Sequence, residues 1–249
     1  MDYSIAKIFH QKTKARYEKG AEKPIDFKSW PKEWTTTYFK SYPRLTKILL
    51  PKPKKLDFSL GKAITKRRSE REFDKKPIDL KDLSQLLFYS AGITLKDKDL
   101  NRTRRGYPSG GGRYPLEVYL FNLDNSKNLK GGIYHYNIRE HFLESLMEKK
   151  NIRKEIYPQA VWQEEILTKA PMILVISGFL GRTMIKYKDR GYRYVLFEAG
   201  HLGQNIYLTS TALGLKCCAI GGFDDDKFHE LLDIDGKNEV VLYVFALGH

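Results

Sequence analysis

One segment, Tyr192 to Gly214, constrains the fold of this chain more than any other: YRYVLFEAGHLGQNIYLTSTALG. Its apolar residues recur at helical spacing and a glycine follows the last of them, which predicts a long helix that ends before Gly214. The stretch APMILVISGF (170–179) is apolar over the length of a strand and predicts a buried strand. A long helix beside a buried strand indicates a domain in which helices cover a sheet.

From residue 58 onwards the other predicted elements follow the same mixed pattern. SLGKAITKRRS predicts a short helix with Ser59 as its N-cap, and DLKDLSQLLFYSAGI predicts a second helix capped by Asp79. LEVYLFNL (116–123) and GGIYHYN (131–137) are expected to be antiparallel neighbours, because only a turn region separates them. LKCCAIGGF predicts a further strand, DDDKFHELLDI a helix with acids at its positive end, and NEVVLYVFALGH a closing strand.

Residues 1–57 have a different character. A basic amphipathic helix is predicted at about 4–19, and aromatic, proline-broken sequence follows it as far as PKPKK at 51–55. The predicted organisation is therefore an N-terminal arm (1–57) and one α+β domain (58–249).

Composition narrows the class of protein. With 249 residues, 41% of them hydrophobic, the chain can build one large domain. It has neither an apolar run of ~20 residues nor a signal-peptide pattern, so a cytoplasmic protein is expected. The only cysteines, Cys217 and Cys218, are adjacent and have no spaced partners, which predicts buried strand residues and no metal site. The net charge of +14 favours anionic partners, although no motif for specific nucleic-acid binding is present.

The segment ITKRRSEREF could bind a phosphate group. Arg67 and Arg71 would share a face if the helix continued through them, and Arg68 and Ser69 lie beside them. The alternative is that basic residues simply favour a helix C-terminus.

Two glycine-rich segments predict close approach of a ligand to the backbone. Gly110 to Gly112 follow Pro108 and Ser109 and precede a strand, so they do not fit a dinucleotide fingerprint, which must follow a strand and open a helix. Three bare positions beside clustered arginines suggest an anionic, flat or bulky ligand. Gly221 and Gly222 end a predicted strand, where a ring could lie on the backbone or the chain could simply turn.

Two further features have both a functional and an ordinary interpretation. Lys186 and Tyr187 stand side by side among basic and aromatic residues, where a lysine of lowered pKa could act as a base, although such a pair is more often surface. On the long helix, small residues at Ala199, Gly200 and Gly203 fit either the core or a close contact between subunits.

In chain order, RRSxRxF, PSGGGRYPL, KYxxRGYR, EAGHLGQN and AIGGF resemble the motifs of the nitroreductase superfamily, and within it of the SagB-type branch. Known members of that branch include flavin oxidases that convert thiazolines and oxazolines of ribosomal peptides into thiazoles and oxazoles. The resemblance covers about residues 58–249, and the arm also looks like the usual N-terminal region of the branch.

The resemblance implies an α+β nitroreductase-like fold, with a mostly antiparallel central sheet flanked by helices, and a homodimer with FMN at the subunit interface. It implies FMN contacts from one subunit by Arg67, Arg68, Ser69 and Arg71 and from the other by Pro108, Ser109 and Gly110. Ala219, Ile220, Gly221 and Gly222 would lie along the isoalloxazine, and Lys186 and Tyr187 match the catalytic pair of the branch. No Lys or Arg follows the last predicted strand, where many nitroreductases have a phosphate-binding cation, so this charge must come from elsewhere.

Two alternatives remain at this stage. An NAD(P)H-dependent reductase of nitroaromatics or quinones would let NADH or NADPH bleach the flavin rapidly without air, whereas an oxidase would not. A basic nucleic-acid-binding protein is suggested by the charge and by the 13% aromatic residues, and it would be colourless with salt-sensitive RNA affinity.

Overall fold

A seven-stranded sheet forms the centre of the computed structural model, which describes residues 4–15, 29–74, 76–95, 103–126, 128–156, 160–162 and 169–249. The strand order is β1-β6-β5-β4-β7-β9-β8, and each pairing is antiparallel. The strands are β1 (Lys47–Leu49), β4 (Leu116–Asn122), β5 (Gly132–Asn137), β6 (Phe142–Glu148), β7 (Met172–Phe179), β8 (Lys216–Ile220) and β9 (Glu239–Gly248). A separate hairpin joins β2 (Ile93–Leu95) to β3 (Arg104–Arg105).

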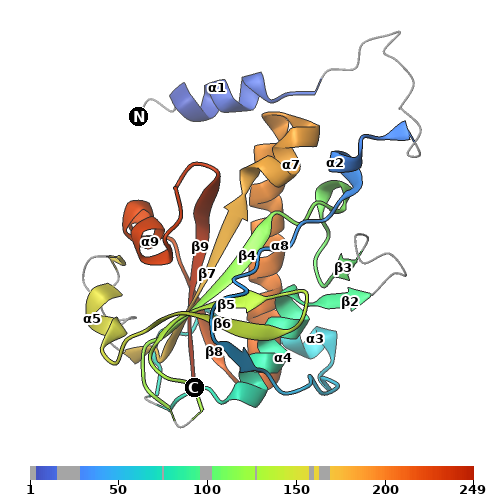
Figure 1. Cartoon of the computed structure of the whole chain (residues 1–249). Coiled ribbons are helices and arrows are strands. Elements are labelled where there is room, and N and C mark those ends of the chain that lie inside the picture. The colour runs from blue at the N-terminus through green and yellow to red at the C-terminus, as the bar shows by residue number, and fades with distance from the viewer. Residues whose placement is uncertain are drawn as a thin grey trace.

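Helices cover both faces of this sheet (Figure 1). On one face lie α3 (Leu60–Lys66), α4 (Leu80–Ala91) and the long α8 (Arg190–Leu213), and on the other lie α5 (Ile152–Ile156) and α9 (Asp225–Leu232). The described residues also form the helices α1 (Ser4–Lys12), α2 (Lys32–Thr35) and α7 (Leu180–Tyr187). The buried apolar residues form two clusters, one on each side of the sheet, so the sheet is the middle layer of the domain.

The predicted elements of the α+β domain are confirmed. Ser59 and Asp79 cap α3 and α4 through side chains that accept hydrogen bonds from the backbone N–H groups of Lys62 and Asp82. Gly214 ends α8 in the left-handed conformation, at φ 72°, which a glycine adopts without steric cost. Both cysteines are free and buried in β8.

Two details differ from the sequence predictions, and one alternative that the sequence left open is decided. Helix α1 ends at Lys12, whereas the prediction extended to about residue 19, and positions 16–19 lie outside the described residues. Helix α3 ends at Lys66 with Arg67 as its C-cap, so Arg67 and Arg71 are not one helical turn apart. For Gly203 the core alternative holds, because a Cβ atom there would lie 2.8 Å from the ring of Phe245 in β9, whereas a Cβ atom at Gly200 would have no neighbour within 4 Å.

Part of the N-terminal segment is joined to the domain. Strand β1 pairs with β6 at the sheet edge, and α1 is attached to the start of α8, where Arg193 Nε donates to Thr13 Oγ1 at 2.6 Å. The boundary at residue 57 therefore stays a prediction. Among the residues that the structure describes, no helix has the length and apolar character needed to cross a bilayer.

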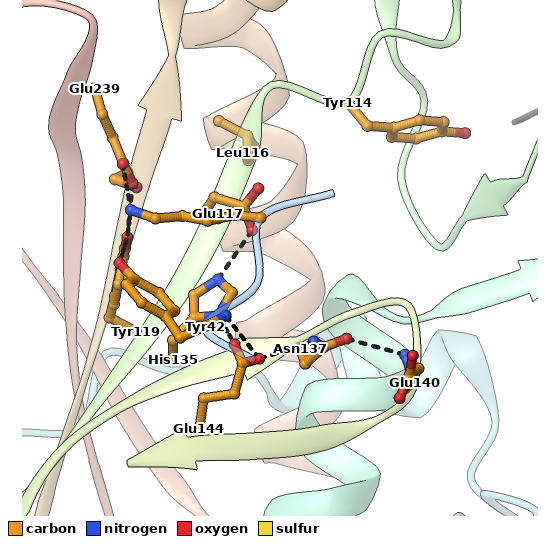
Figure 2. A network of polar contacts seen from close by, with 12 residues as sticks. Tyr42, Tyr114, Leu116, Glu117, Tyr119, His135, Asn137, Glu140, Glu144 and Glu239 are labelled. Atoms are coloured by element: carbon orange, nitrogen blue, oxygen red, sulfur yellow. Dashed lines mark hydrogen bonds and ion pairs between the residues drawn. The ribbon is translucent and has the colours of Figure 1, made fainter. Parts of the chain in front are cut away.

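A buried polar network connects this segment to the sheet. Figure 2 shows His135 of β5 between Glu117 of β4 and Glu144 of β6, at 3.1 Å and 2.7 Å from its two ring nitrogens. Lys40 Nζ lies 2.6 Å from Glu239 Oε2 in the same region. All three carboxylates are buried, so each depends on its partners to remain charged.

The pKa values in this network reflect the competition between burial and pairing. Burial alone would raise the pKa of Glu117, but the charge of Arg182 and the hydrogen bond from His135 lower it to about 2. Burial alone would lower the pKa of His135, but hydrogen bonds to Glu117 and Glu144 raise it instead. The network is therefore held together by charged groups on the four strands β4, β5, β6 and β9, together with Arg182 of α7 and Lys40.

Candidate active site

The three-glycine turn lies directly against Lys186 and Tyr187. Gly111 has φ +66°, and a Cβ atom there would lie 2.7 Å from Tyr187 Oη and 3.2 Å from Lys186 Nζ. A side chain at this position would thus be strained and would also collide with the pair. The bare backbone of the 3₁₀ turn Gly110–Gly112 leaves room for the two side chains that the sequence singled out.

Helix α7, which carries this pair, is fixed at its other end. Arg182 Nη1 contacts Glu117 Oε1 at 2.5 Å, and Arg113 Nε donates to the Arg182 carbonyl oxygen at 2.8 Å. Arg113 follows the glycine turn and is almost fully buried. The turn, α7 and the buried network are therefore one connected unit that places Lys186 and Tyr187.

Lys186 is covered by aromatic rings from the N-terminal segment. Its Nζ lies 3.2 Å from the centre of the Trp30 ring and 5.8 Å from that of Trp34. Burial, and then the charge of Arg113, lower the pKa of Lys186. The face of Trp30 acts in the opposite direction, because an aromatic face attracts the ammonium form.

Tyr187 is a neutral phenol in this environment. Burial raises its pKa, and its ring packs edge-to-face on Tyr194 of α8 at 4.9 Å between centroids. A lysine whose pKa is lowered stands next to a phenol that keeps its proton. Such a pair can accept a proton at one atom and donate one at the other.

Ser109 and Gly110 are held by Glu198, a residue of α8 to which sequence reasoning gave no role. Glu198 Oε1 accepts hydrogen bonds from Ser109 Oγ and from the Gly110 backbone N–H, both at 3.0 Å. Its Oε2 is buried and has no hydrogen-bond partner among the described residues. Burial raises the pKa of Glu198 to about 7, although these two hydrogen bonds oppose the shift.

We expect Glu198→Gln to change how stability depends on pH. Because the folded-state pKa is raised, the unfolded chain ionises first, and the wild type loses stability as the pH rises from about 4.5 to about 7. Glutamine does not titrate, so the free energy of unfolding of the variant minus that of the wild type should increase by on the order of 2–3 kcal/mol across this window. Urea denaturation at pH 5 and pH 8 measures it. The exposed Glu33→Gln is the control, and a difference that is flat with pH would contradict the assignment.

A second group of predicted residues meets around Tyr207 of α8. Ser69 Oγ lies 3.0 Å from Tyr207 Oη, and the Ala219 backbone N–H donates to the same oxygen at 2.7 Å. The Arg67 guanidinium lies 5.3 Å from the centre of the Tyr207 ring. Sequence reasoning missed Tyr207, which connects the basic segment to the strand β8.

The other basic residues lie around this group. Arg68 lies with Lys66 and Lys216 in the wall of a pocket of 280 Å³, and its guanidinium donates to the carbonyl oxygens of Thr65 and Arg67. Arg71 is exposed and close enough to Cys218 for its charge to act on the thiol, although burial dominates and raises the pKa of Cys218. Lys216 is a cation of β8 that the sequence prediction did not include.

The strand end after Ile220 is only partly open. A Cβ atom at Gly221 would have no neighbour within 4 Å, whereas one at Gly222 would lie 3.1 Å from the ring of Trp162. Ile220 itself is fully buried. Gly221 therefore leaves its backbone accessible. Gly222 has little space for a side chain because the ring of Trp162 lies beside it.

The two groups are separated within one chain. Glu198 and Tyr207 are nine positions apart on the continuous helix α8, a rise of about 14 Å. One chain thus brings Gly111, which follows Pro108, Ser109 and Gly110, to Lys186 and Tyr187, and brings Arg67 and Ser69 to Ala219 through Tyr207. It does not bring these two sets together.

Sequence comparison matches this chain to one protein family and to two relatives over most of its length. A sequence model described as "Nitroreductase family" matches residues 64–249. MJ1384 of Methanocaldococcus jannaschii, which carries the name of a nitroreductase, is 34% identical over 181 residues, or 72% of this chain and 86% of its own. The microcin B17-processing protein McbC of Escherichia coli is 30% identical over 178 residues, or 70% of this chain and 64% of McbC.

Solved structures show the same fold. A protein of Anabaena variabilis named as a nitroreductase matches with TM-score 0.74 and 27% identity over 98% of this chain. The match covers 46% of that protein, so this chain spans less than half of its length. The E. coli microcin synthetase McbBCD complex with truncated pro-MccB17 matches with TM-score 0.62 and 24% identity over 99% of this chain and 92% of that chain. A nitroreductase-named protein of Exiguobacterium sibiricum in complex with FMN matches with TM-score 0.54 and 12% identity over 78% and 89%.

Proposed function

This chain belongs to the nitroreductase family, and on that premise we propose that it is an FMN-dependent oxidoreductase of SagB type that oxidises azoline rings in a peptide or a related small substrate. The observation that carries the proposal is the contact between Gly111 and the pair Lys186–Tyr187. The 30% identity to McbC, which processes microcin B17, supports a peptide substrate. A reduction by NAD(P)H would not need such a pair beside the flavin.

The residues present fit an FMN molecule. Arg67, Arg68, Ser69 and Arg71 would bind its phosphate, ribityl chain and pyrimidine edge, with Lys216, which lines the same pocket as Arg68, as a further cation. Ala219, Ile220, Gly221 and Gly222 would line the ring, which the open side of Gly221 permits. The unpartnered Oε2 of Glu198 leaves a polar atom for a ligand next to Ser109 and Gly110. When bound, FMN would supply the acceptor for the hydride.

The separation along α8 supports a site shared between two subunits. Pro108, Ser109 and Gly110 of one subunit would complete the site that Arg67 and Ala219 form in its partner. We therefore propose a homodimer with two sites, in which dissociation releases FMN. Size-exclusion chromatography with absorbance detection measures the oligomeric state and the bound FMN together. A monomer that retains all its flavin would exclude the shared site.

Lys186 and Tyr187 would carry out the proton transfer. Oxidation of an azoline removes a proton and a hydride from adjacent ring atoms. Lys186 Nζ, whose pKa burial lowers, would act as the base that accepts the proton, and Tyr187 Oη would donate a hydrogen bond that orients the substrate or relays the proton. The Gly111 turn keeps both side chains at the site.

The first experiment is the visible spectrum of the purified protein, followed by turnover of a thiazoline peptide in air. A yellow protein that forms the thiazole supports the proposal, and a colourless protein overturns it. Rapid bleaching by NADH or NADPH without air, with no azoline oxidation, would instead identify a reductase of nitroaromatics or quinones.

We expect Arg67→Ala and Arg71→Ala to weaken FMN binding by about one to two decades, because a charge-assisted hydrogen bond to phosphate contributes about 1.5–3 kcal/mol. Fluorescence titration of the apoprotein with FMN measures the affinity. Arg44→Ala removes an exposed arginine elsewhere and should leave the affinity unchanged. If both variants bind FMN as tightly as the wild type, the phosphate lies elsewhere.

A further inference from the structure

The N-terminal segment forms a pocket next to the proposed catalytic pair. The pocket has a volume of 440 Å³ and is walled by Trp30, Trp34 and Arg104 together with Ser109 and Gly111. This volume is typical of small-ligand sites and is much larger than one five-membered ring requires. Ser109 belongs both to this pocket and to the proposed FMN contacts, so the pocket adjoins the reaction site.

The wall contributed by the N-terminal segment is fixed in place. Arg113 Nη1 donates to the Thr36 carbonyl oxygen at 2.7 Å, and Thr37 Oγ1 donates to the Gly112 carbonyl oxygen at 3.1 Å. Arg113 and Thr37 are both buried. The chain next to Trp34 is therefore held against the glycine turn, in part by Arg113, which also holds α7 through the Arg182 carbonyl oxygen.

The position of Trp30 separates the pocket from the proton-transfer pair. Trp30 lies over Lys186 Nζ and also forms a wall of the pocket, whereas Lys186 is outside the pocket walls. With the reacting ring at Lys186 and Tyr187, as the proposed function has it, a group in the pocket would therefore lie beside that ring.

The walls define the chemistry of that group. The rings of Trp30 and Trp34 are 6.1 Å apart at 71°, so they offer both a face and an edge to a flat π system. Arg104 contributes a cation with several N–H donors, and no acidic side chain lines the pocket among the described residues. A flat ring that carries hydrogen-bond acceptors fits these walls, since it can stack on the tryptophans and also accept from Arg104, which a phenyl ring cannot do.

We propose that this pocket binds an already oxidised azole next to the azoline that reacts, so that the protein acts on peptides in which the neighbouring ring was completed first. The assignment rests on the proposed function and adds to it an order of reaction along the peptide. The azole ring stacks on the tryptophans, and its nitrogen or the adjacent carbonyl oxygen accepts hydrogen bonds from Arg104. The reaction that supplies this substrate is an earlier oxidation of the same kind.

The test compares two inert peptides that differ only in the neighbouring unit, thiazole–thiazole–glycinamide and glycine–thiazole–glycinamide, by calorimetric titration of the FMN-loaded protein. We expect the first to bind about ten- to a hundredfold more tightly, since stacking on aromatic side chains contributes on this scale. This preference should disappear in Trp34→Ala and in Arg104→Ala and should be largely kept in Trp34→Phe. Arg44→Ala is the matched control for Arg104→Ala.

The outcomes separate this inference from the proposed function. Equal affinity for the two peptides, or a preference that survives in both Trp34→Ala and Arg104→Ala, overturns the pocket assignment even if a thiazoline peptide is oxidised. A preference that depends on Trp34 and Arg104 supports the pocket even if the oxidation assay fails, in which case only the proposed activity is overturned.

Discussion

Lys186→Ala should lower the turnover of a thiazoline peptide by about 10²–10⁴-fold, the usual contribution of a general acid or base. The fold and the FMN content should persist, because Lys186 lies at the end of α7 and its truncation opens no cavity in the buried core. Tyr187→Phe removes only the hydroxyl group and should also lower turnover. Steady-state oxidation, with absorbance of bound flavin as the measure of loading, provides both readings.

Lys188→Ala is the matched control for this prediction. Lys188 is the next lysine along the chain, is exposed, and follows the last residue of α7. Removing its charge should leave turnover nearly unchanged. Unchanged azoline oxidation in Lys186→Ala would remove this residue from the mechanism, and an equal loss in Lys188→Ala would point to a general effect of positive charge.

The largest expected effect on stability is that of His135→Ala, at about 3–5 kcal/mol of the free energy of unfolding at pH 6. The substitution leaves the buried carboxylates of Glu117 and Glu144 without the partner that lies between them. A buried charge that loses its partner keeps its desolvation cost, and this cost exceeds the value of the pair itself. Urea denaturation gives the free energy, with the exposed His201→Ala as control.

The effect of His135→Ala should also depend on pH. The pKa of His135 is raised in the folded protein, so its contribution is complete below about 6.5 and is lost as the pH rises through the folded-state pKa. The contributions of Glu117 and Glu144, whose pKa values are lowered, are lost as the pH falls below about 4.3. The destabilisation should therefore be smaller at pH 9 than at pH 6, and a constant difference would show that packing alone is lost.

Most of the fold followed from local patterns. Capping residues such as Ser59, Asp79 and Gly214 identified helix ends, because their side chains or backbone conformations act within one turn of the helix. Strand β1 was not predicted, since its three residues alternate between exposed and half-buried positions and depend on β6 for pairing. The charged residues of the network were not predicted to be core residues, because a buried Glu is recognisable only once its partners are placed.

The candidate site was predicted in parts. The contact between the glycine turn and Lys186–Tyr187 joins segments about seventy residues apart, and the sequence suggested each segment but not their meeting. Glu198 stood inside a motif used for the resemblance, yet an acid within a helix carries no local sign of burial. Trp30 and Trp34 are spaced four apart in KSWPKEW and are two of three tryptophans, which could have marked them. Arg67 and Arg71 would have shared a face only if the helix continued through them, and this condition is not met because Arg67 already leaves the helix.

Helix α8 also has a consequence for how this chain can vary. On the proposed dimer, the stretch from Glu198 to Tyr207 acts as a spacer that fixes both the distance and the angular phase between two half-sites. Substitutions within it change packing locally, whereas a one-residue insertion would turn everything beyond it by about 100° and shift it by about 1.5 Å. The number of residues in this stretch should therefore tolerate less change than their identity, and functional descendants of this chain should differ there in composition while keeping the length.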